Sequence, residues 1–279
     1  MNTLNYNLKN GIDIPAIGYG TWRTNDADAK SAVCEAVKCG YRLIDTAAIY
    51  ANEKGVGQGI KSCGLPREKL FVTSKLWNSE RGYDKTMKAF EQSIKDLGTD
   101  YLDLYLIHWP ANKLQCDDPD SINLSTWNAF IKLYKEGRIK AIGVSNFMPH
   151  HLKPLMQTEV QPMVNQIEFH PGYTQPETVK FCKENGILVE AWSPLGRGNI
   201  FSEPVLLALA AKYNKTAAQI CIRFAIDSGI VPLPKSVTPQ RIKENFDVFD
   251  FSLSKEDIEK IENMSACGYS GLHPDSFSR

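Results

Sequence analysis

The stretch Phe71-Val72-Thr73-Ser74-Lys75, the segment 84–97 and the stretch Leu104-Tyr105-Leu106-Ile107-His108 predict a strand, a helix and a second strand. The two apolar runs are short and dense, as in strands buried on both faces, whereas the middle segment has apolar residues at helical spacing. Such a unit forms a parallel strand pair, because the crossover is right-handed and its helix covers the sheet. These stretches therefore place the fold in the α/β class.

The same alternation extends in both directions along the chain. It predicts eight strand and helix pairs: 16–20 with 26–39, 41–44 with 52–63, 70–75 with 84–97, 102–107 with 124–136, 139–144 with 149–158, 163–167 with 175–185, 187–191 with 203–227 (broken near Asn214), and 230–232 with 238–246. Glycines just past four helix ends act as helix stops: Gly40, Gly98, Gly137 and Gly186. Eight repeats predict a TIM (β/α)8 barrel, with residues 1–279 in a single domain.

Two short alternating stretches, 4–8 and 12–17, precede the first repeat and are joined at Asn10-Gly11. This dipeptide is the strongest two-residue signal for a hairpin with a type I′ turn. We therefore expect an N-terminal β-hairpin over residues 4–17. A C-terminal tail, 265–279, follows the last repeat.

A doubly wound sheet is the alternative to a barrel. Such a sheet normally carries GxGxxG after its first strand, where it binds a nucleotide. Here Gly18-Tyr19-Gly20 lacks the third glycine, and Gly55-Val56-Gly57-Gln58-Gly59 has a different spacing inside a helical segment. The barrel is therefore the favoured fold.

The composition narrows the possible partners. The 279 residues include 32 Lys plus Arg and 32 Asp plus Glu, so the formal net charge is zero. Nucleic acids and anionic membranes attract basic surfaces, so neither is expected as a partner. The longest apolar run, 205–211, is far shorter than the roughly 20 residues of a membrane span, and the first thirteen residues do not resemble a secretory signal. We therefore expect a cytoplasmic protein.

The cysteines and histidines show no metal-binding spacing. Seven cysteines are scattered without a CxxC pair, which predicts reduced thiols: Cys34, Cys39, Cys63, Cys116, Cys182, Cys221 and Cys267. The five histidines form no HExxH motif, so no metal is expected. His150, His151 and His273 are predicted to be surface residues, and His170 is predicted to be structural.

Ionisable side chains stand where three consecutive predicted strands end. Asp45 follows the second strand, with Tyr50 in the loop after it; Lys75 ends the third strand and His108 ends the fourth. Catalytic groups of TIM barrels lie at the C-terminal ends of the strands, so these four are expected on one rim.

The four residue types suggest proton transfer. A lysine ammonium about 4 Å from a phenol favours the phenolate, so Lys75 is expected to lower the pKa of Tyr50 toward neutrality. A carboxylate beside Lys75 would keep the lysine charged, and His108 would orient the substrate oxygen. A phenol of this kind protonates an oxygen that gains negative charge, as in carbonyl reduction. The hydride then has to come from a cofactor, since no side chain donates one.

Seven motifs extend this pattern along the chain: Gly40–Glu53, Ser74-Lys75-Leu76-Trp77, Ile107-His108-Trp109-Pro110, Gly143-Val144-Ser145-Asn146-Phe147, Asn165-Gln166, Trp192-Ser193-Pro194-Leu195-Gly196 and Pro234-Lys235-Ser236. In this order they resemble the aldo-keto reductases, particularly the short bacterial branch related to 2,5-diketogluconate reductases. The resemblance begins near Ile12 and runs to the C-terminus. It implies a monomeric TIM barrel that uses NADPH to reduce aldehydes or ketones to alcohols. Asp45, Tyr50, Lys75 and His108 fall on the four catalytic positions, with Tyr50 as proton donor.

The same resemblance implies a cofactor site and a substrate pocket. Ser145, Asn146 and Gln166 match residues that bind the nicotinamide carboxamide, and Trp192 stands where many members have a Tyr or Phe under the nicotinamide ring. The positions that match the pyrophosphate loop are Ser193, Leu195 and Gly196. Those that match the adenosine end with its 2′-phosphate are Lys235, Ser236, Thr238, Arg241, Glu244 and Asn245. Those that match the substrate pocket are Trp22, Trp77 and Trp109.

Two other functions are compatible with the same rim. A strand-end lysine such as Lys75 also serves Schiff-base lyases, which borohydride traps covalently with a carbonyl substrate. A regulatory subunit that binds the cofactor without turnover is the second, and the complete catalytic set argues against it. The identity of the carbonyl substrate is not encoded, because the variable segments 111–123, 197–203 and 265–279 carry no motif.

Overall fold

The computed structural model describes residues 4–278, so Met1–Thr3 and Arg279 of the predicted domain and tail lie outside the described residues. Within this range, eight parallel strands form one sheet in sequence order: β3 (Gly18–Gly20), β4 (Leu43–Asp45), β5 (Phe71–Leu76), β6 (Leu102–Ile107), β7 (Ile139–Ser145), β8 (Val164–Glu168), β9 (Leu188–Trp192) and β10 (Val231–Pro232). A hydrogen bond from the Gly20 amide to the Pro234 carbonyl, 3.0 Å, connects β3 to the segment after β10. The sheet is therefore a nearly closed barrel, and the predicted TIM barrel is confirmed.

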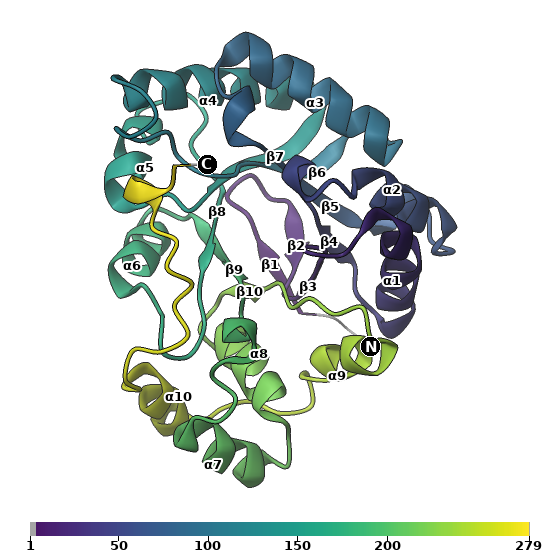
Figure 1. Ribbon diagram of the computed structural model, residues 1–279, viewed down its shortest axis with the longest axis vertical. Helices are drawn as coiled ribbons and strands as arrows, with labels where there is room; N and C mark the ends of the chain where they lie inside the picture. Colours follow the sequence, from purple (N-terminus) through teal and green to yellow (C-terminus); the bar gives the residue numbers. More distant parts are fainter. Residues whose placement is uncertain (1–3, 279) are drawn as a thin grey trace.

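Helices surround the strands (Figure 1). They are α1 (Asp26–Cys39), α2 (Glu53–Ser62), α3 (Tyr83–Leu97), α4 (Pro119–Lys135), α5 (Pro149–Leu155), α6 (Pro176–Glu184), α7 (Pro204–Tyr213), α8 (Ala217–Asp227), α9 (Pro239–Phe246) and α10 (Lys255–Glu262). Short 3₁₀ helices are η1 (Ala48–Tyr50), η2 (Arg67–Lys69), η3 (Asn78–Glu80), η4 (Gly196–Gly198) and η5 (Pro274–Ser276). No helix within residues 4–278 is both long and apolar enough to cross a membrane.

Two helices differ most from the prediction, and α5 ends at Leu155 rather than at 158. Helix α4 begins at Pro119 rather than at 124, because Asp118 accepts a hydrogen bond from the Ser121 amide (3.1 Å) and proline suits the first helical turn. Helix α10 was not predicted, although Ser254 caps it by accepting from the Asp257 amide. The predicted break near Asn214 is confirmed, since that residue ends α7 with a positive φ of 51°.

The glycine at position 18 lets the barrel close. A Cβ there would lie 2.4 Å from the side chain of Leu233 and 2.6 Å from that of Leu43. Both leucines are buried, so neither has free space to move into. Glycine is therefore required at position 18 for β3 to fit between β4 and the segment after β10.

The N-terminal hairpin is confirmed, but its predicted turn type is wrong. Strands β1 (Asn5–Asn7) and β2 (Asp13–Pro15) pair antiparallel. A type I′ turn needs positive φ at both central residues, whereas only Gly11 of Asn10-Gly11 has one, at 84°. The Gly11 amide donates to the Leu8 carbonyl (2.8 Å) and the Leu8 amide to the Ile12 carbonyl (2.9 Å). This is a three-residue loop with a glycine bulge, because the turn also includes Lys9.

The hairpin covers the end of the barrel where the strands begin. In Figure 1 it lies across the middle of the ring of strands. The side chain of Asn10 donates to the carbonyl of Lys140, near the start of β7, at 3.0 Å. Two residues of the hairpin itself, Leu8 and Ile14, are buried. Because this end is covered, the opposite end, where the strands finish, is the one available for a site.

Candidate active site

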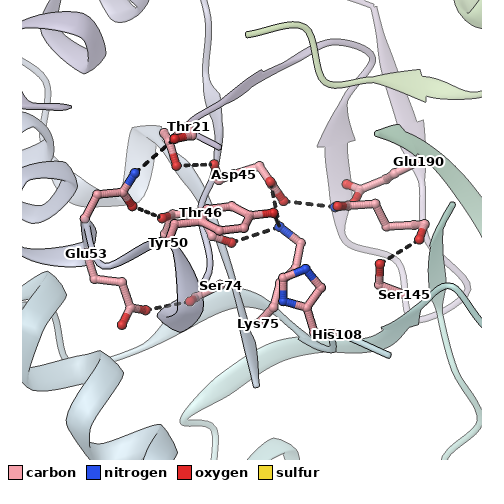
Figure 2. A network of polar contacts seen from close by, with 12 residues as sticks. Thr21, Asp45, Thr46, Tyr50, Glu53, Ser74, Lys75, His108, Ser145 and Glu190 are labelled. Atoms are coloured by element: carbon pink, nitrogen blue, oxygen red, sulfur yellow. Dashed lines mark hydrogen bonds and ion pairs between the residues drawn. The ribbon is translucent and has the colours of Figure 1, made fainter. Parts of the chain in front are cut away.

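The four side chains predicted for catalysis lie together in the structure (Figure 2). Asp45 is the last residue of β4, Lys75 lies near the end of β5, and His108 directly follows β6. Tyr50 ends η1, in the connection between β4 and α2. Its ring meets the His108 imidazole edge to face, with the centroids 5.7 Å apart. The strand-end rule thus placed all four residues at one rim.

Lys75 is fully buried and donates in three directions. Its Nζ lies 2.7 Å from Asp45 Oδ1, 2.9 Å from the Thr46 carbonyl and 3.5 Å from the Tyr50 hydroxyl. Burial lowers the pKa of Lys75, but the charge of Asp45, with further contributions from Tyr50 and Glu190, raises it more. The lysine therefore stays charged at neutral pH, as expected from a neighbouring carboxylate.

The predicted direction of the Tyr50 pKa shift is wrong. Burial raises the pKa of the phenol above its usual value; Lys75 lowers it, and Asp45 raises it again. The lysine has less effect than expected because its charge lies closer to Asp45, at 2.7 Å, than to the phenol, at 3.5 Å. Tyr50 is consequently a protonated phenol at neutral pH, the form that donates a proton.

His108 is neutral in this environment. Burial, followed by the positive charges of Lys75 and Arg81, holds the pKa of His108 well below its usual value. Its Nδ1 is buried and has no hydrogen-bond partner within the described part of the chain. The indole of Trp77 packs edge to face on the imidazole at 5.3 Å. A neutral imidazole next to a phenol is suited to orient a carbonyl oxygen.

The residues predicted to bind the nicotinamide form a connected hydrogen-bond group. Ser145 and Gln166 are register partners in β7 and β8, and the Ser145 hydroxyl donates to the Gln166 carbonyl at 2.7 Å. Asn146 donates through Nδ2 to the His108 carbonyl (2.9 Å) and to Ser145 Oγ (3.1 Å). The Trp192 indole donates to Asn146 Oδ1 at 2.7 Å, which holds the indole beside these amides.

A buried acidic residue, Glu190, adjoins this group and was not predicted. Gln166 Nε2 donates both to Asp45 Oδ2 (2.9 Å) and to Glu190 Oε2 (2.8 Å). Burial and the nearby charge of Asp45 raise the pKa of Glu190 to about 8. The sequence contained one signal for it: Glu190 is the only charged residue in the apolar run 187–191, which was predicted to be a buried strand.

The predicted pyrophosphate loop follows β9. Ser193 and Gly196 both have positive φ, 49° and 52°, within the turn that leads to η4. A Cβ on Gly196 would lie 2.9 Å from the side chain of Ile200. Leu195, between them, packs partly buried against the core. The loop is therefore tightly shaped at the end of β9, directly after Trp192.

The predicted adenosine-end residues lie in one continuous segment from the end of β10 through α9. Lys235 donates to the Arg23 carbonyl at 3.2 Å, and Ser236 Oγ accepts from the Thr238 amide at 3.0 Å. Thr238 and Arg241 are exposed, whereas Asn245 is buried. Glu244 accepts a hydrogen bond from Thr216 Oγ1 at 2.9 Å, which turns its carboxylate toward α8.

The three tryptophans predicted for the substrate pocket divide into two groups. Trp109 stacks on Phe277 of the C-terminal tail, with centroids 4.1 Å apart, and Trp77 meets the same ring edge to face at 6.3 Å. Trp22 is exposed and lies under the guanidinium groups of Arg23, at 4.5 Å, and Arg197, at 5.4 Å. Phe277 was not predicted, because the tail carries no motif that marks it.

The prediction that His151 is a surface residue is wrong. The tail covers it: Asp275 Oδ1 lies 3.0 Å from His151 Nε2 and 2.9 Å from His150 Nε2. Burial and the His150 charge lower the pKa of His151 to about 4. Its Nδ1 accepts from the Met148 amide, so the proton of the neutral ring is on Nε2 and points at Asp275. The contacts of Asp275 with His150 and His151 therefore tie the tail to α5.

Comparison with known proteins gives one consistent result. A family model described as the aldo/keto reductase family matches residues 16–266. The chain is 50% identical over 270 residues to the glyoxal reductase of Bacillus subtilis (strain 168), covering 96% of this chain and 95% of that protein. It is 43% identical over 273 residues to the methylglyoxal reductase DkgA of Escherichia coli (strain K12), covering 97% and 96%. A crystal structure of a Bombyx mori aldo-keto reductase in complex with NADP superposes with a TM-score of 0.86 at 39% identity, covering 94% and 92%.

Proposed function

The chain belongs to the aldo/keto reductase family, and we propose that Tyr50 is the proton donor in its NADPH-dependent reduction of carbonyl groups. The observation that carries this role is the hydrogen bond from Lys75 to Tyr50. An ammonium group only donates, so the phenolic oxygen accepts and its own hydrogen is left for another acceptor. Bound NADPH supplies the hydride.

The other three residues support this proton transfer. As the phenol loses its proton, the ammonium of Lys75 stabilises the negative charge that forms on the Tyr50 oxygen. Asp45 holds the ammonium in place at 2.7 Å and keeps it charged. His108, neutral and 5.7 Å from the Tyr50 ring centroid, orients the carbonyl oxygen toward the phenol.

The predicted cofactor residues fit a nicotinamide. Ser145, Asn146 and Gln166 form a neutral polar group that suits an uncharged carboxamide, and Trp192 beside them offers a flat face to the ring. The loop of Ser193, Leu195 and Gly196 would hold the pyrophosphate. The adenosine end would be bound by Lys235, Ser236, Thr238, Arg241, Glu244 and Asn245. The half-buried Lys235 and the exposed Arg241 suit a 2′-phosphate.

We also propose that small aldehydes and α-dicarbonyl compounds are the substrates. Two relatives over nearly the whole chain are named glyoxal reductase and methylglyoxal reductase. The rings of Trp77, Trp109 and Phe277 pack together next to His108, so an aromatic wall stands beside the catalytic group.

The Schiff-base alternative fits the site poorly. A lysine that forms a Schiff base has to attack as a neutral amine. The ammonium of Lys75 instead donates to Asp45, Thr46 and Tyr50, and its pKa is raised. The complete catalytic set likewise opposes a regulatory subunit without turnover.

The test is a spectrophotometric assay of NADPH oxidation with glyoxal, methylglyoxal, simple aldehydes, sugars and keto acids. We expect NADPH oxidation with glyoxal, methylglyoxal and simple aldehydes. This oxidation should be lost in Tyr50→Phe. Incubation with borohydride and a carbonyl substrate should leave the protein mass unchanged. A covalent adduct on Lys75, or unchanged turnover in the Tyr50 variant, would contradict the assignment.

Three further expectations stay predictions: a single domain over residues 1–279, a monomeric state and a cytoplasmic location. The zero net charge supports the expectation that the protein has no nucleic-acid partner. Sedimentation of the purified protein tests the monomer, since a dimer would sediment at about twice the mass of 31.3 kDa.

A further inference from the structure

Glu190 is a buried carboxyl group next to the proposed nicotinamide site, and the proposed function gives it no role. It lies in β9, fully buried, and it is the direct register partner of Gln166 in β8. Its Oε2 accepts from Gln166 Nε2 at 2.8 Å, while its Oε1 has no hydrogen-bond partner within residues 4–278. Figure 2 shows Glu190 on the far side of Asp45 from Tyr50 and Glu53. Its contacts therefore run to Gln166 and not to the proton donor.

The two carboxyl groups determine which way the Gln166 amide faces. Its NH2 group has two hydrogens, and Asp45 Oδ2 and Glu190 Oε2 accept one each, at 2.9 and 2.8 Å. A turned amide would lose both of these bonds and would bring its oxygen against the carboxylate of Asp45, which cannot donate. Among the described residues no hydrogen bond reaches Gln166 Oε1. This oxygen is therefore left as an acceptor for a ligand.

The neighbouring side chains also have no free hydrogen to donate. The Ser145 hydroxyl donates its hydrogen to the Gln166 carbonyl, and the Asn146 amide donates its two hydrogens to the His108 carbonyl and to Ser145 Oγ. What each has left is acceptor capacity. The group thus presents acceptors only, and a carboxamide meets them with its NH2 rather than with its oxygen.

We propose that Glu190 is a positioning residue, which holds the Gln166 amide so that Oε1 receives an N–H of the nicotinamide carboxamide. Asp45 binds only one of the two amide hydrogens, so without Glu190 the second hydrogen is unpaired and a single bond no longer fixes the orientation of the amide. This inference rests on the proposed function of Gln166 in cofactor binding.

The test compares two ligands that differ only at the carboxamide. NADP⁺ carries the NH2 group, and 3-acetylpyridine adenine dinucleotide phosphate carries a methyl group in its place. Binding is measured by quenching of tryptophan fluorescence in the unmodified protein and in the variants Glu190→Leu and Glu190→Gln. Because binding alone is read, no turnover is needed.

We expect the unmodified protein to prefer NADP⁺. In Glu190→Leu the dissociation constant for NADP⁺ should rise about tenfold, which corresponds to about 1.4 kcal/mol, while that for the acetylpyridine analogue stays within twofold. Glu190→Gln keeps an oxygen acceptor for Gln166, so it should retain most of the preference. Glu190→Met, which also lacks an acceptor, is made in case the leucine variant does not fold, and the same loss of preference is expected.

Glu53→Gln is the matched control. Glu53 is also a buried carboxyl near Lys75, but it accepts from Ser74 (2.6 Å) and Ser93 (3.1 Å) and does not contact Gln166. The Glu53→Gln variant should prefer NADP⁺ over the acetylpyridine analogue as strongly as the unmodified protein does. A retained preference for NADP⁺ in Glu190→Leu, or its loss in Glu190→Gln, would overturn the positioning role. Equal affinity for both ligands in the unmodified protein would instead overturn the role of Gln166 itself.

Discussion

Lys75 Nζ lies 3.5 Å from the hydroxyl oxygen of Tyr50 and can only donate to it. This direction leaves the phenolic hydrogen free to move to a substrate oxygen, and it puts a positive charge next to the phenolate that results. In the resting state burial outweighs that charge and raises the pKa of Tyr50. The pair is therefore arranged for proton donation, with the lysine acting mainly on the charge that develops during the reaction.

Tyr50→Phe removes the proton donor and keeps the ring. Carbonyl reduction should fall at least about 10²-fold, the usual range for loss of a general acid. NADPH binding should change little, because the hydroxyl faces Lys75 rather than the predicted cofactor residues. Initial rates of NADPH oxidation and fluorescence titration with NADPH check the two parts. Near-normal turnover would show that another group donates the proton.

Lys75→Met removes the charge that stabilises the phenolate. We expect a rate loss similar to that of Tyr50→Phe, because Asp45 then remains to raise the pKa of Tyr50 further. The variant also leaves Asp45 without its cation, so thermal unfolding has to be recorded as a control. A folded variant with full activity and an unchanged pH profile would exclude this role for Lys75.

The two directions of the reaction should depend on pH in opposite ways. Reduction uses Tyr50 as a phenol, which is the prevailing form through the neutral range since its pKa is raised. Oxidation of an alcohol uses the phenolate, so its rate should rise with pH for as long as the protein is folded. Initial rates in both directions, corrected for cofactor stability, check this. A single shared optimum would contradict one common acid and base.

Glu190 makes folding stability depend on pH. Its pKa is about 8 in the folded protein and about 4.3 in an unfolded chain, so the folded state retains a proton that the unfolded state releases. This contribution is complete below pH 4.3 and is lost as the pH rises through 8, at about 1.4 kcal/mol per pKa unit. Denaturant unfolding measures the free energy of unfolding from pH 5 to 8, and this energy should fall less steeply with pH in Glu190→Gln than in the unmodified protein. The same dependence on pH in both proteins would show that Glu190 does not hold a proton in the folded state.

Arg241→Ala tests the predicted site of the 2′-phosphate. Arg241 is exposed in the first turn of α9, and a guanidinium binds a phosphate by charge-assisted hydrogen bonds worth about 1.5–3 kcal/mol each. The dissociation constant for NADPH should rise about 10- to 100-fold and that for NADH only slightly. Added salt should weaken NADPH binding selectively.

Lys243→Ala is the control for this experiment, since Lys243 is also basic, exposed and on α9. It should leave both dissociation constants unchanged. Equal losses for NADPH and NADH in the Arg241 variant would place the phosphate elsewhere.

The sequence by itself determined the barrel and its catalytic rim. Strands buried on both faces require continuous apolar runs, so eight such runs separated by helical segments were visible directly. Because parallel strands share one direction, residues at the ends of consecutive runs, such as Asp45, Lys75 and His108, had to meet at one edge. The dipeptide Asn10-Gly11 did not determine the turn type, since one additional loop residue, Lys9, changes it.

Only the tertiary structure decided the electrostatics and the contacts across the barrel. Gln166 bonds Asp45 although 121 positions separate them, and it bonds Glu190 because the two are neighbours in the register of β8 and β9. The pKa of Tyr50 is raised because burial of the phenol outweighs the charge of Lys75 3.5 Å away. Burial and interatomic distance set these energies, and both arise only when the barrel closes and the tail packs on Trp109.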